Sequence, residues 1–180
     1  MSRYYPDMVT IRHATTGDGA ACAAIYRPYV TGTAVSFEID PPSTPEMAGR
    51  ISEAQRSHAW LVAEIDGRVI GYAYASPFAA REAYRWSCEV SVYLEPGRGR
   101  SGLGRALYGV LLPHLTERGF RVAVAKMTLP NDASMGLHAA LGFRPVGVHR
   151  NIGFKNGAWY DVAIAQLHLA TGGDPPRELR

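Results

Sequence analysis

The stretch 87–108, SCEVSVYLEPGRGRSGLGRALY, decides the fold. Its first eight residues alternate between apolar and polar, which predicts a strand with Cys88 on the core face and Glu89 on the polar face. From Leu103 onward apolar residues recur at helical spacing, which predicts a helix. A strand, a glycine-rich turn and a helix therefore follow one another near the centre of the chain.

The glycine-rich turn, residues 97–104, joins that strand to that helix. At such a junction the free N–H groups of the first helical turn attract an anion, and glycines let the backbone approach a phosphate closely. Three interpretations are open: a flexible turn, a dinucleotide site with the pattern G-x-G-x-x-G at 97–102, and a pyrophosphate cradle. The dinucleotide interpretation needs an acid about 20 residues further on, and the strand at 121–128 offers none.

Patterns on either side of this stretch place the other elements. Asp66-Gly67 is a preferred two-residue turn between strand-like runs and predicts a hairpin over 60–75. Pro28 is expected to kink or end the first helix. The remaining predictions are a strand at 9–12, an extended piece at 34–37, a helix capped by Thr44, a strand at 122–126, a short helix capped by Asp132, and an antiparallel pair over 143–151 and 158–169.

This order of elements predicts one α/β (α+β) domain over residues 1–170. Its central sheet is expected to be mixed and mostly antiparallel, with helices on both faces. Residues 171–180 are rich in Gly, Pro and Arg and are expected to form a flexible tail. A chain of 180 residues is too short for two ordinary domains, and 47% apolar residues suffice for a sizeable core.

Composition and charge exclude several classes of function. The formal charge is +3, from 19 basic and 16 acidic residues, without the basic stripe that nucleic-acid binding needs. Only two of the basic residues are lysines, Lys126 and Lys155. No apolar run approaches the ~20 residues of a membrane span, and residues 1–6 lack the apolar part of a secretory signal. The two cysteines fit a cytoplasmic protein without disulfides.

The histidines outside the central motifs give no metal-binding spacing, so no metal site is expected. They are interpreted as surface or edge residues: His13, His58, His114, His149 and His168. Cys88 alternates onto the face opposite Glu89 and is therefore interpreted as a core residue, not as a nucleophile.

The central stretch resembles the acyl-CoA motif of the GNAT N-acetyltransferase superfamily in residues 90–94, in the turn Gly102-Leu103-Gly104 and in the helix that follows. The usual pattern is Gln/Arg-x-x-Gly-x-Gly/Ala, and here Gly99 stands at its first position with an arginine on either side. The resemblance implies acetyl-CoA as the co-substrate. The residues implied to bind it in this stretch are Val92, Tyr93, Leu94, Arg100, Ser101, Gly102, Leu103, Gly104 and Arg105.

A second block, residues 131–134 and 138–143, resembles the later motif of the same family, in which Asn131 and Ser134 are implied to bind the pantetheine arm. The resemblance extends to one branch of the family, the phosphinothricin and methionine sulfoximine N-acetyltransferases, over roughly residues 9 to 169. The segments that carry it are 60–64, 81–86, 129–132 and 153–159.

Acetyl transfer to an amine needs a base for the ammonium, donors for the oxyanion, and an acid for the departing thiolate. Glu89, on the polar face of its strand, is the candidate base, which the branch resemblance supports. His138 occupies the position of the thiolate acid in the family, and its imidazole can donate a proton near neutral pH. Tyr93 and Tyr108 are auxiliary donors or packing residues. The resemblance also implies that the strand separates from its neighbour near Val92 and frees amides for the thioester.

The resemblance implies a small amino-acid-like substrate of the phosphinothricin, methionine sulfoximine or methionine sulfone type. Arg81 is the candidate carboxylate or phosphinate clamp, and Phe37 and Tyr84 are candidate pocket walls. The alternatives are a protein or peptide N-acetyltransferase and a non-catalytic acyl-CoA sensor. A homodimer is expected from the branch and from the aromatics of the last hairpin, Phe154, Trp159 and Tyr160.

Overall fold

The computed structural model describes residues 9–170, 176, 178 and 179. Seven strands form one sheet in the order β1-β2-β3-β4-β5-β7-β6. Neighbouring strands are antiparallel except β4 and β5, which are parallel, so the expected mixed, mostly antiparallel sheet is confirmed. The strands are β1 (Thr10–His13), β2 (Ala59–Ile65), β3 (Arg68–Pro77), β4 (Ser87–Leu94), β5 (Val122–Thr128), β6 (Arg144–Lys155) and β7 (Ala158–His168).

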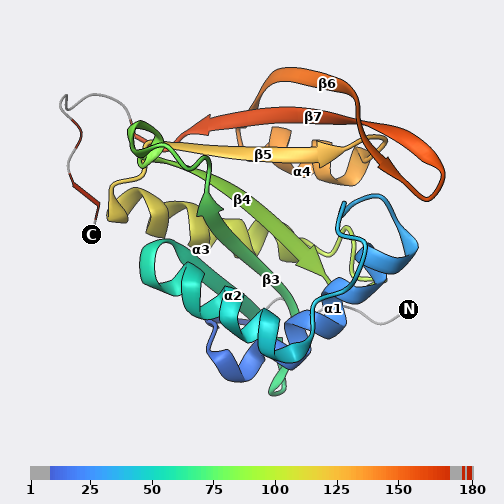
Figure 1. Cartoon of the computed structure of the whole chain (residues 1–180). Helices are drawn as coiled ribbons and strands as arrows, with labels where there is room; N and C mark the ends of the chain where they lie inside the picture. Colours follow the sequence, from blue (N-terminus) through green and yellow to red (C-terminus); the bar gives the residue numbers. More distant parts are fainter. Residues whose placement is uncertain (1–8, 171–175, 177, 180) are drawn as a thin grey trace.

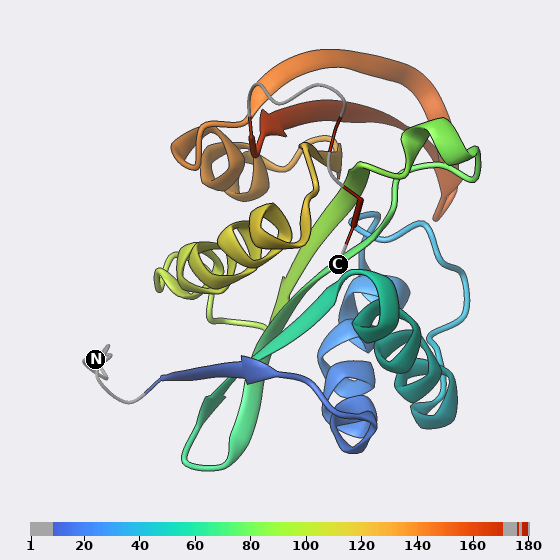
Figure 2. The same cartoon turned by 90° about the vertical axis from the view of Figure 1, so that its left-hand side faces the viewer.

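Helices cover both faces of the sheet, as Figures 1 and 2 show. The helices are α1 (Gly19–Gly32), α2 (Thr44–Ser57), α3 (Leu103–Arg118) and α4 (Asp132–Ala140), with short 3₁₀ turns η2 (Thr16–Asp18) and η3 (Glu82–Tyr84). Helices α1 and α2 pack on one face, and α3 and α4 pack on the other. In the described part of the chain no helix is both long and apolar enough to cross a membrane.

Each face of the sheet has its own hydrophobic core. The core under α3 is filled by leucines at helical spacing and by Cys88, whose thiol pKa burial raises to about 12. The core under α1 and α2 is aromatic, with Trp60 and Tyr72 stacked at a centroid distance of 5.1 Å. Because side chains alternate along β4, Glu89 lies on the α1 side, opposite Cys88. The expected assignment of Cys88 to the core is confirmed.

Pro28 does not end the first helix, which continues to Gly32. A proline removes the hydrogen bond to the carbonyl four residues earlier, here that of Ala24. Ala24 and Pro28 both lie on the exposed side of α1, so water can satisfy that carbonyl. The segment 33–43 that follows contains no strand or helix, in agreement with the loop expected between the first two helices.

Two helix caps lie one residue earlier than expected. Ser43, not Thr44, caps α2, and Asn131, not Asp132, caps α4. In both helices the cap side chain accepts a hydrogen bond from the backbone N–H three residues later. A cap residue stands just outside the helical backbone, where its side chain reaches those free N–H groups, and this position is fixed by backbone geometry and not by residue type alone.

His58 is buried, in contrast to the expected surface position. Its side chain is packed at the end of α2 against Phe120, with ring centroids 5.0 Å apart. Burial lowers its pKa to about 4. Among the described residues no group of three or more His, Cys, Asp or Glu side chains is placed to hold a metal ion.

Strands β4 and β5 pair only at their N-terminal ends. The last paired residues are Glu89 and Val124, and beyond them the strands diverge, as Figure 1 shows. The expected separation of the strands is therefore present. An opening lined by Lys126 and Val92 forms between them, adjoins the cavity at the glycine-rich turn, and is flanked by α4.

The segment 171–180, expected to be a tail, lies largely outside the described residues. Of its described residues, Glu178 pairs with Arg85 at 3.3 Å. The boundary of a single domain at residue 170 stays a prediction.

Candidate active site

The glycine-rich turn forms a cradle of free amides at the start of α3. Gly102 adopts a left-handed backbone with a φ of 82°. The N-cap residue Gly102 has no side chain, and the amide of Leu103 donates to Ser101 Oγ at 3.4 Å. Among the described residues the amides of Gly104 and Arg105 meet no hydrogen-bond acceptor. A cavity of about 560 Å³ opens at these amides and extends to Asn131 and Ser134 of the α4 N-terminus. Free amides at the start of a helix attract an anion.

The arginines around the turn differ in availability. Arg98 donates to Glu95 at 2.6 Å, and Arg68 pairs with the same carboxylate. Arg68, with Arg98, lowers the pKa of Glu95 to about 2. Arg105 donates to the last carbonyl of α4 at 3.0 Å. Arg100 is exposed, and within the described chain it has no partner, so its guanidinium is available to a phosphate.

Gly104 is required by packing as well as by the cradle. An added Cβ at this position would lie 3.0 Å from Leu137 of α4. The first turn of α3 therefore rests directly on α4, and this contact fixes the distance between the cradle and the two α4 residues Asn131 and Ser134. The side chain of Asn131 is itself engaged, because its Oδ1 accepts from the amide of Ser134 at 3.1 Å.

His138 is buried beside Tyr108 on the inner wall of the opening. Its Nδ1 lies 2.8 Å from the carbonyl oxygen of Ser134, which can only accept, so Nδ1 carries a proton. The hydroxyl of Tyr108 lies 3.2 Å from Nε2 and donates to it when the ring is neutral. Burial lowers the pKa of His138 and raises that of Tyr108. The two side chains therefore form a neutral hydrogen-bonded pair at neutral pH.

Glu89 lies where β4 and β5 begin to diverge, on the α1 side of the sheet. Its Oε2 forms an ion pair with Nζ of Lys126 on β5, at 2.7 Å. The Glu89 side chain is 26% exposed, so solvent and a small molecule can reach it. Lys126, the partner of the carboxylate, lines the opening between β4 and β5, which adjoins the cavity at the glycine cradle.

A second cavity, of about 390 Å³, lies between α2 and β3 beside Glu89. Ser76 lines it and is the direct partner of Glu89 in the β3–β4 register. Tyr74 also lines it, and burial raises its pKa. Arg50 reaches it from α2 and is held by Glu38 through hydrogen bonds of 2.7 and 2.9 Å.

The α1–α2 loop, residues 33–43, lies against the β6–β7 hairpin (Figure 1). The ring of Phe37 lies directly over Gly153, leaving no room for a side chain there. Tyr160 flanks the ring at a centroid distance of 6.4 Å. Phe37 is 38% exposed, so one side of the ring remains open.

Lys155 holds this loop to the hairpin from inside. Its side chain is 4% exposed, and Nζ donates to the carbonyl oxygens of Val30 and Ser36 at 2.6 Å each. Burial lowers the pKa of Lys155. The compact ammonium group fits between two backbone carbonyls, where a planar guanidinium would be too large.

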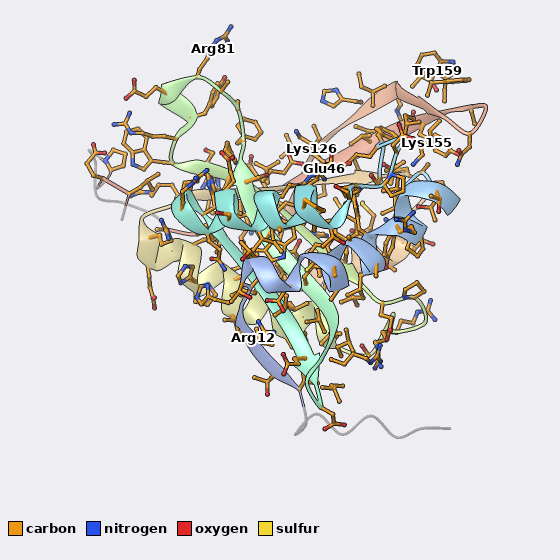
Figure 3. The ribbon with its side chains drawn as sticks, turned by 60° about the horizontal axis from the view of Figure 1, so that its bottom comes forward. Arg12, Glu46, Arg81, Lys126, Lys155 and Trp159 are labelled. Atoms are coloured by element: carbon orange, nitrogen blue, oxygen red, sulfur yellow. The ribbon has the colours of Figure 1, made fainter. Side chains whose placement is uncertain are left out.

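The structure does not bring Arg81 beside Glu89. Arg81 lies on the loop between β3 and β4, and Figure 3 shows it pointing away from the molecule, well apart from Lys126. Tyr84, on the same loop, is 42% exposed and contacts Phe78 edge-on at 5.5 Å.

Tyr93, one of the auxiliary donors considered from sequence, packs in the aromatic core. Its ring lies 4.8 Å from that of Tyr26 and 5.2 Å from that of Tyr29. Sequence reasoning singled out neither Lys126 nor Lys155 as a site residue. The available signal was compositional, since they are the only lysines in an arginine-rich chain.

Comparison with known proteins agrees with this geometry. Residues 11–164 match the family described as Acetyltransferase (GNAT) domain. A phosphinothricin N-acetyltransferase of Streptomyces viridochromogenes is 41% identical over 172 residues, covering 96% of this chain and 93% of the relative. An L-methionine sulfoximine/L-methionine sulfone acetyltransferase of Salmonella typhimurium is 33% identical, covering 89% of this chain and 95% of the relative.

A phosphinothricin acetyltransferase of Sinorhizobium meliloti, solved in complex with acetyl-CoA, superimposes with a TM-score of 0.87. It is 37% identical and covers 94% of this chain and 95% of its own. The expected fold and the expected enzyme class, an acetyl-CoA-dependent N-acetyltransferase, are therefore confirmed. The chain belongs to the GNAT acetyltransferase family, within the branch that holds the phosphinothricin and methionine sulfoximine N-acetyltransferases.

Proposed function

We propose that this protein transfers the acetyl group of acetyl-CoA to the amino group of a small amino-acid-like substrate. The observation that carries the proposal is the divergence of β4 and β5 beyond Glu89. The cavity at the amide cradle and the opening lined by Lys126, the ion partner of Glu89, share Val92 and Ser134. The thioester of a coenzyme bound at the cradle then lies next to an amine bound by Glu89. The acetyl group therefore passes directly from acetyl-CoA to the amine in a ternary complex.

In the proposed coenzyme site, the amides of residues 102–105 hold the pyrophosphate and Arg100 adds a cation. Ser101 donates its hydroxyl to the carbonyl of Arg98 at 2.7 Å and so shapes the turn. Asn131 and Ser134 line the path of the pantetheine arm. The amides near Val92 and Leu94, on the part of β4 that no longer pairs with β5, stabilise the thioester oxygen.

In the proposed chemistry, Glu89 takes a proton from the substrate ammonium, directly or through a water molecule. The free amine attacks the carbonyl carbon, a C–N bond forms, and the oxyanion is held by the backbone amides. The C–S bond then breaks and the carbonyl re-forms. The new amide nitrogen releases its second proton, and the thiolate takes up a proton through the His138–Tyr108 pair, which is reprotonated from solvent and ends neutral as it began. Burial of Cys88 and Cys22 leaves neither thiol available as an intermediate acetyl carrier.

A free amino acid suits the acceptor side better than a peptide. The cavity beside Glu89 has a volume of about 390 Å³, and Glu38, next to Phe37 in the α1–α2 loop, holds Arg50 at its wall. Phe37 and Tyr84 remain the proposed pocket walls. Arg81 takes part only if its loop moves inward from the observed position.

The test is release of CoA thiol from acetyl-CoA with a panel of amines. The panel contains phosphinothricin, methionine sulfoximine, methionine sulfone, common amino acids and short peptides. The expected result is acetylation of one or more of the free amino acids and none of the peptides. Acetylation of peptides alone supports a peptide acetyltransferase, and coenzyme binding without any transfer supports a sensor.

We further propose that the protein is located in the reducing cytoplasm. We also propose that it forms a homodimer through the β6–β7 hairpin. Exposed apolar side chains gather on this hairpin: Val146, Val148, Ile152, Phe154 and Trp159. Figure 3 shows Trp159 near its end, projecting outward. Such side chains are costly to leave in water and are frequent in interface cores. Sedimentation is expected to show a dimer that Trp159→Glu weakens, and a monomeric wild type at micromolar concentration would refute it.

A further inference from the structure

Glu89 and Lys126 form an ion pair in which only Glu89 has a role in the proposed chemistry. Lys126 belongs to none of the sequence motifs and has no role so far. Nζ and Oε2 are 2.7 Å apart, and both side chains are reachable, at 42% and 26% exposure. Lys126 stands two residues beyond the last β4–β5 pair, Glu89 with Val124. It therefore reaches back across the mouth of the opening to the proposed base.

Other cations near this region are already engaged or distant. Arg50 is bound by Glu38 through two hydrogen bonds, and Lys155 is buried on two carbonyls. Arg81 points away from the molecule (Figure 3). Of these four cations, Lys126 is the one that lies within ion-pair distance of Glu89 and so can meet a substrate that approaches it.

An α-amino acid carries an ammonium and a carboxylate one carbon atom apart. Beside a protein ammonium–carboxylate pair, such a molecule can place each charge next to its opposite. An amine without a carboxylate has no group that can pair with Lys126. Its ammonium must share Glu89 with the ammonium of Lys126, and the repulsion between these like charges at close range disfavours binding.

We propose that the Glu89–Lys126 pair recognises the substrate as a free amino-acid zwitterion, Glu89 binding the ammonium and Lys126 the α-carboxylate. The inference rests on the proposed function and narrows its substrate class. It makes Lys126 a specificity-determining residue that excludes simple amines and peptide N-termini.

The experiment compares L-methionine sulfone with its primary amide, which keeps the amine and removes the carboxylate charge. Calorimetry measures the binding of each compound to the enzyme–CoA complex, and thiol release measures kcat/KM with acetyl-CoA. The wild type is expected to bind the acid about fivefold more tightly than the amide, because a partly exposed ion pair is worth up to about 1 kcal/mol.

In Lys126→Met this preference is expected to fall to within about twofold, mainly through weaker binding of the acid. Lys126→Arg keeps the charge and is expected to retain part of the preference. The matched control is Arg144→Met, which removes an exposed cation of β6 and is expected to leave the preference unchanged. Because the Lys126 side chain is 42% exposed, its replacement does not disturb a core.

The inference is overturned if the wild type binds the acid and the amide with equal affinity, or if Lys126→Met keeps the wild-type preference for the acid. Equal kcat/KM for acid and amide overturns the zwitterion inference while the acetyltransferase function stands. Tighter binding of the acid without any thiol release supports the inference and refutes the function instead.

Discussion

The two ends of the opening between β4 and β5 are built in different ways. The coenzyme end is a continuous turn, residues 97–105, that rests on α4 at Leu137. The acceptor end is assembled from segments far apart in the chain, with Phe37 from one loop, Lys126 from β5 and Gly153 from β6. A local turn fixes backbone amides, whereas an assembled surface depends on tertiary packing. Changes at the two ends should therefore separate coenzyme affinity from amine specificity.

The largest expected effect comes from Glu89→Gln, at the acceptor end. Removing a positioned base lowers kcat on the order of 10²-fold or more, while the affinity for acetyl-CoA stays within about twofold because the cradle is untouched. Thiol release and calorimetry measure the two quantities. Glu82→Gln, a change on the exposed loop before β4, serves as the control with wild-type values. A wild-type kcat in Glu89→Gln would remove this carboxylate from the mechanism.

The coenzyme end is the part that sequence predicts well. The strand, the glycine-rich turn and the helix are contiguous, and their dihedral requirements are visible in the residue types themselves. The hairpin at Asp66-Gly67 is of the same kind, and both of its turn residues have positive φ in the structure. Glu89 and the cradle could be predicted together because they lie within one continuous stretch of sequence, residues 87–108.

The acceptor end could not be predicted in the same way. Nothing in the local sequence of Lys126 or Lys155 indicates which groups they meet, since their partners are 37 and more than 100 residues away in the chain. Gly153 shows no positive φ that a turn rule would detect; it is required because the ring of Phe37 occupies its side-chain space. Arg81 is the converse case: its motif position does not fix where an exposed loop points, so its role as a clamp stays a prediction.

A change in the cradle should show the opposite pattern to Glu89→Gln. Gly102→Val forces a branched side chain into the left-handed backbone at a φ of 82° and distorts the amides that face the cavity. The Kd of acetyl-CoA is expected to rise about tenfold or more, as measured by calorimetry.

The matched control is Gly67→Val, at a φ of 76° in the β2–β3 hairpin. It carries the same kind of backbone strain far from the turn, so it is expected to lower stability without changing coenzyme affinity. If both valine variants weaken acetyl-CoA binding equally, the effect is general destabilisation and the cradle assignment is wrong.

Lys155→Met tests whether the acceptor end depends on the clamp between the α1–α2 loop and the hairpin. The variant keeps the length of the side chain but leaves two buried carbonyls without their donor, at a cost of about 1–3 kcal/mol each. The loop that carries Phe37 is expected to loosen, so KM for the amine rises about tenfold while Kd for acetyl-CoA changes little.

Arg150→Met is the control for the clamp, because it removes an exposed ion pair with Asp161 from the same hairpin. It is expected to leave KM unchanged. Lys155→Arg is not expected to restore the wild-type KM for the amine, since the guanidinium does not fit between the carbonyls of Val30 and Ser36. An unchanged amine KM in a folded Lys155→Met would show that the loop is held by Phe37 packing alone.

His58 is expected to have the smallest effect on activity, because it concerns stability alone. The sequence pattern wrongly predicted a surface position for this residue, which is buried. Its pKa is lowered to about 4 by burial, with a smaller contribution from Arg118, against an ordinary value of 6.5. The unfolded chain therefore binds a proton that the native protein does not, at every pH between these values. Stability contributed by this group is complete above pH 6.5 and is lost as pH falls toward 4.

The loss amounts to roughly 3 kcal/mol between pH 7 and pH 4, from about 1.4 kcal/mol per pH unit. Urea unfolding at pH 7, 6, 5 and 4 measures it, and His58→Gln is expected to flatten that pH dependence by close to one proton. His149→Gln, on the exposed strand β6, is the control and is expected to keep the wild-type slope. The same slope in all three proteins would mean that His58 is reached by water in the native state, and that the junction of α2 with Phe120 is looser than the 5.0 Å ring contact implies.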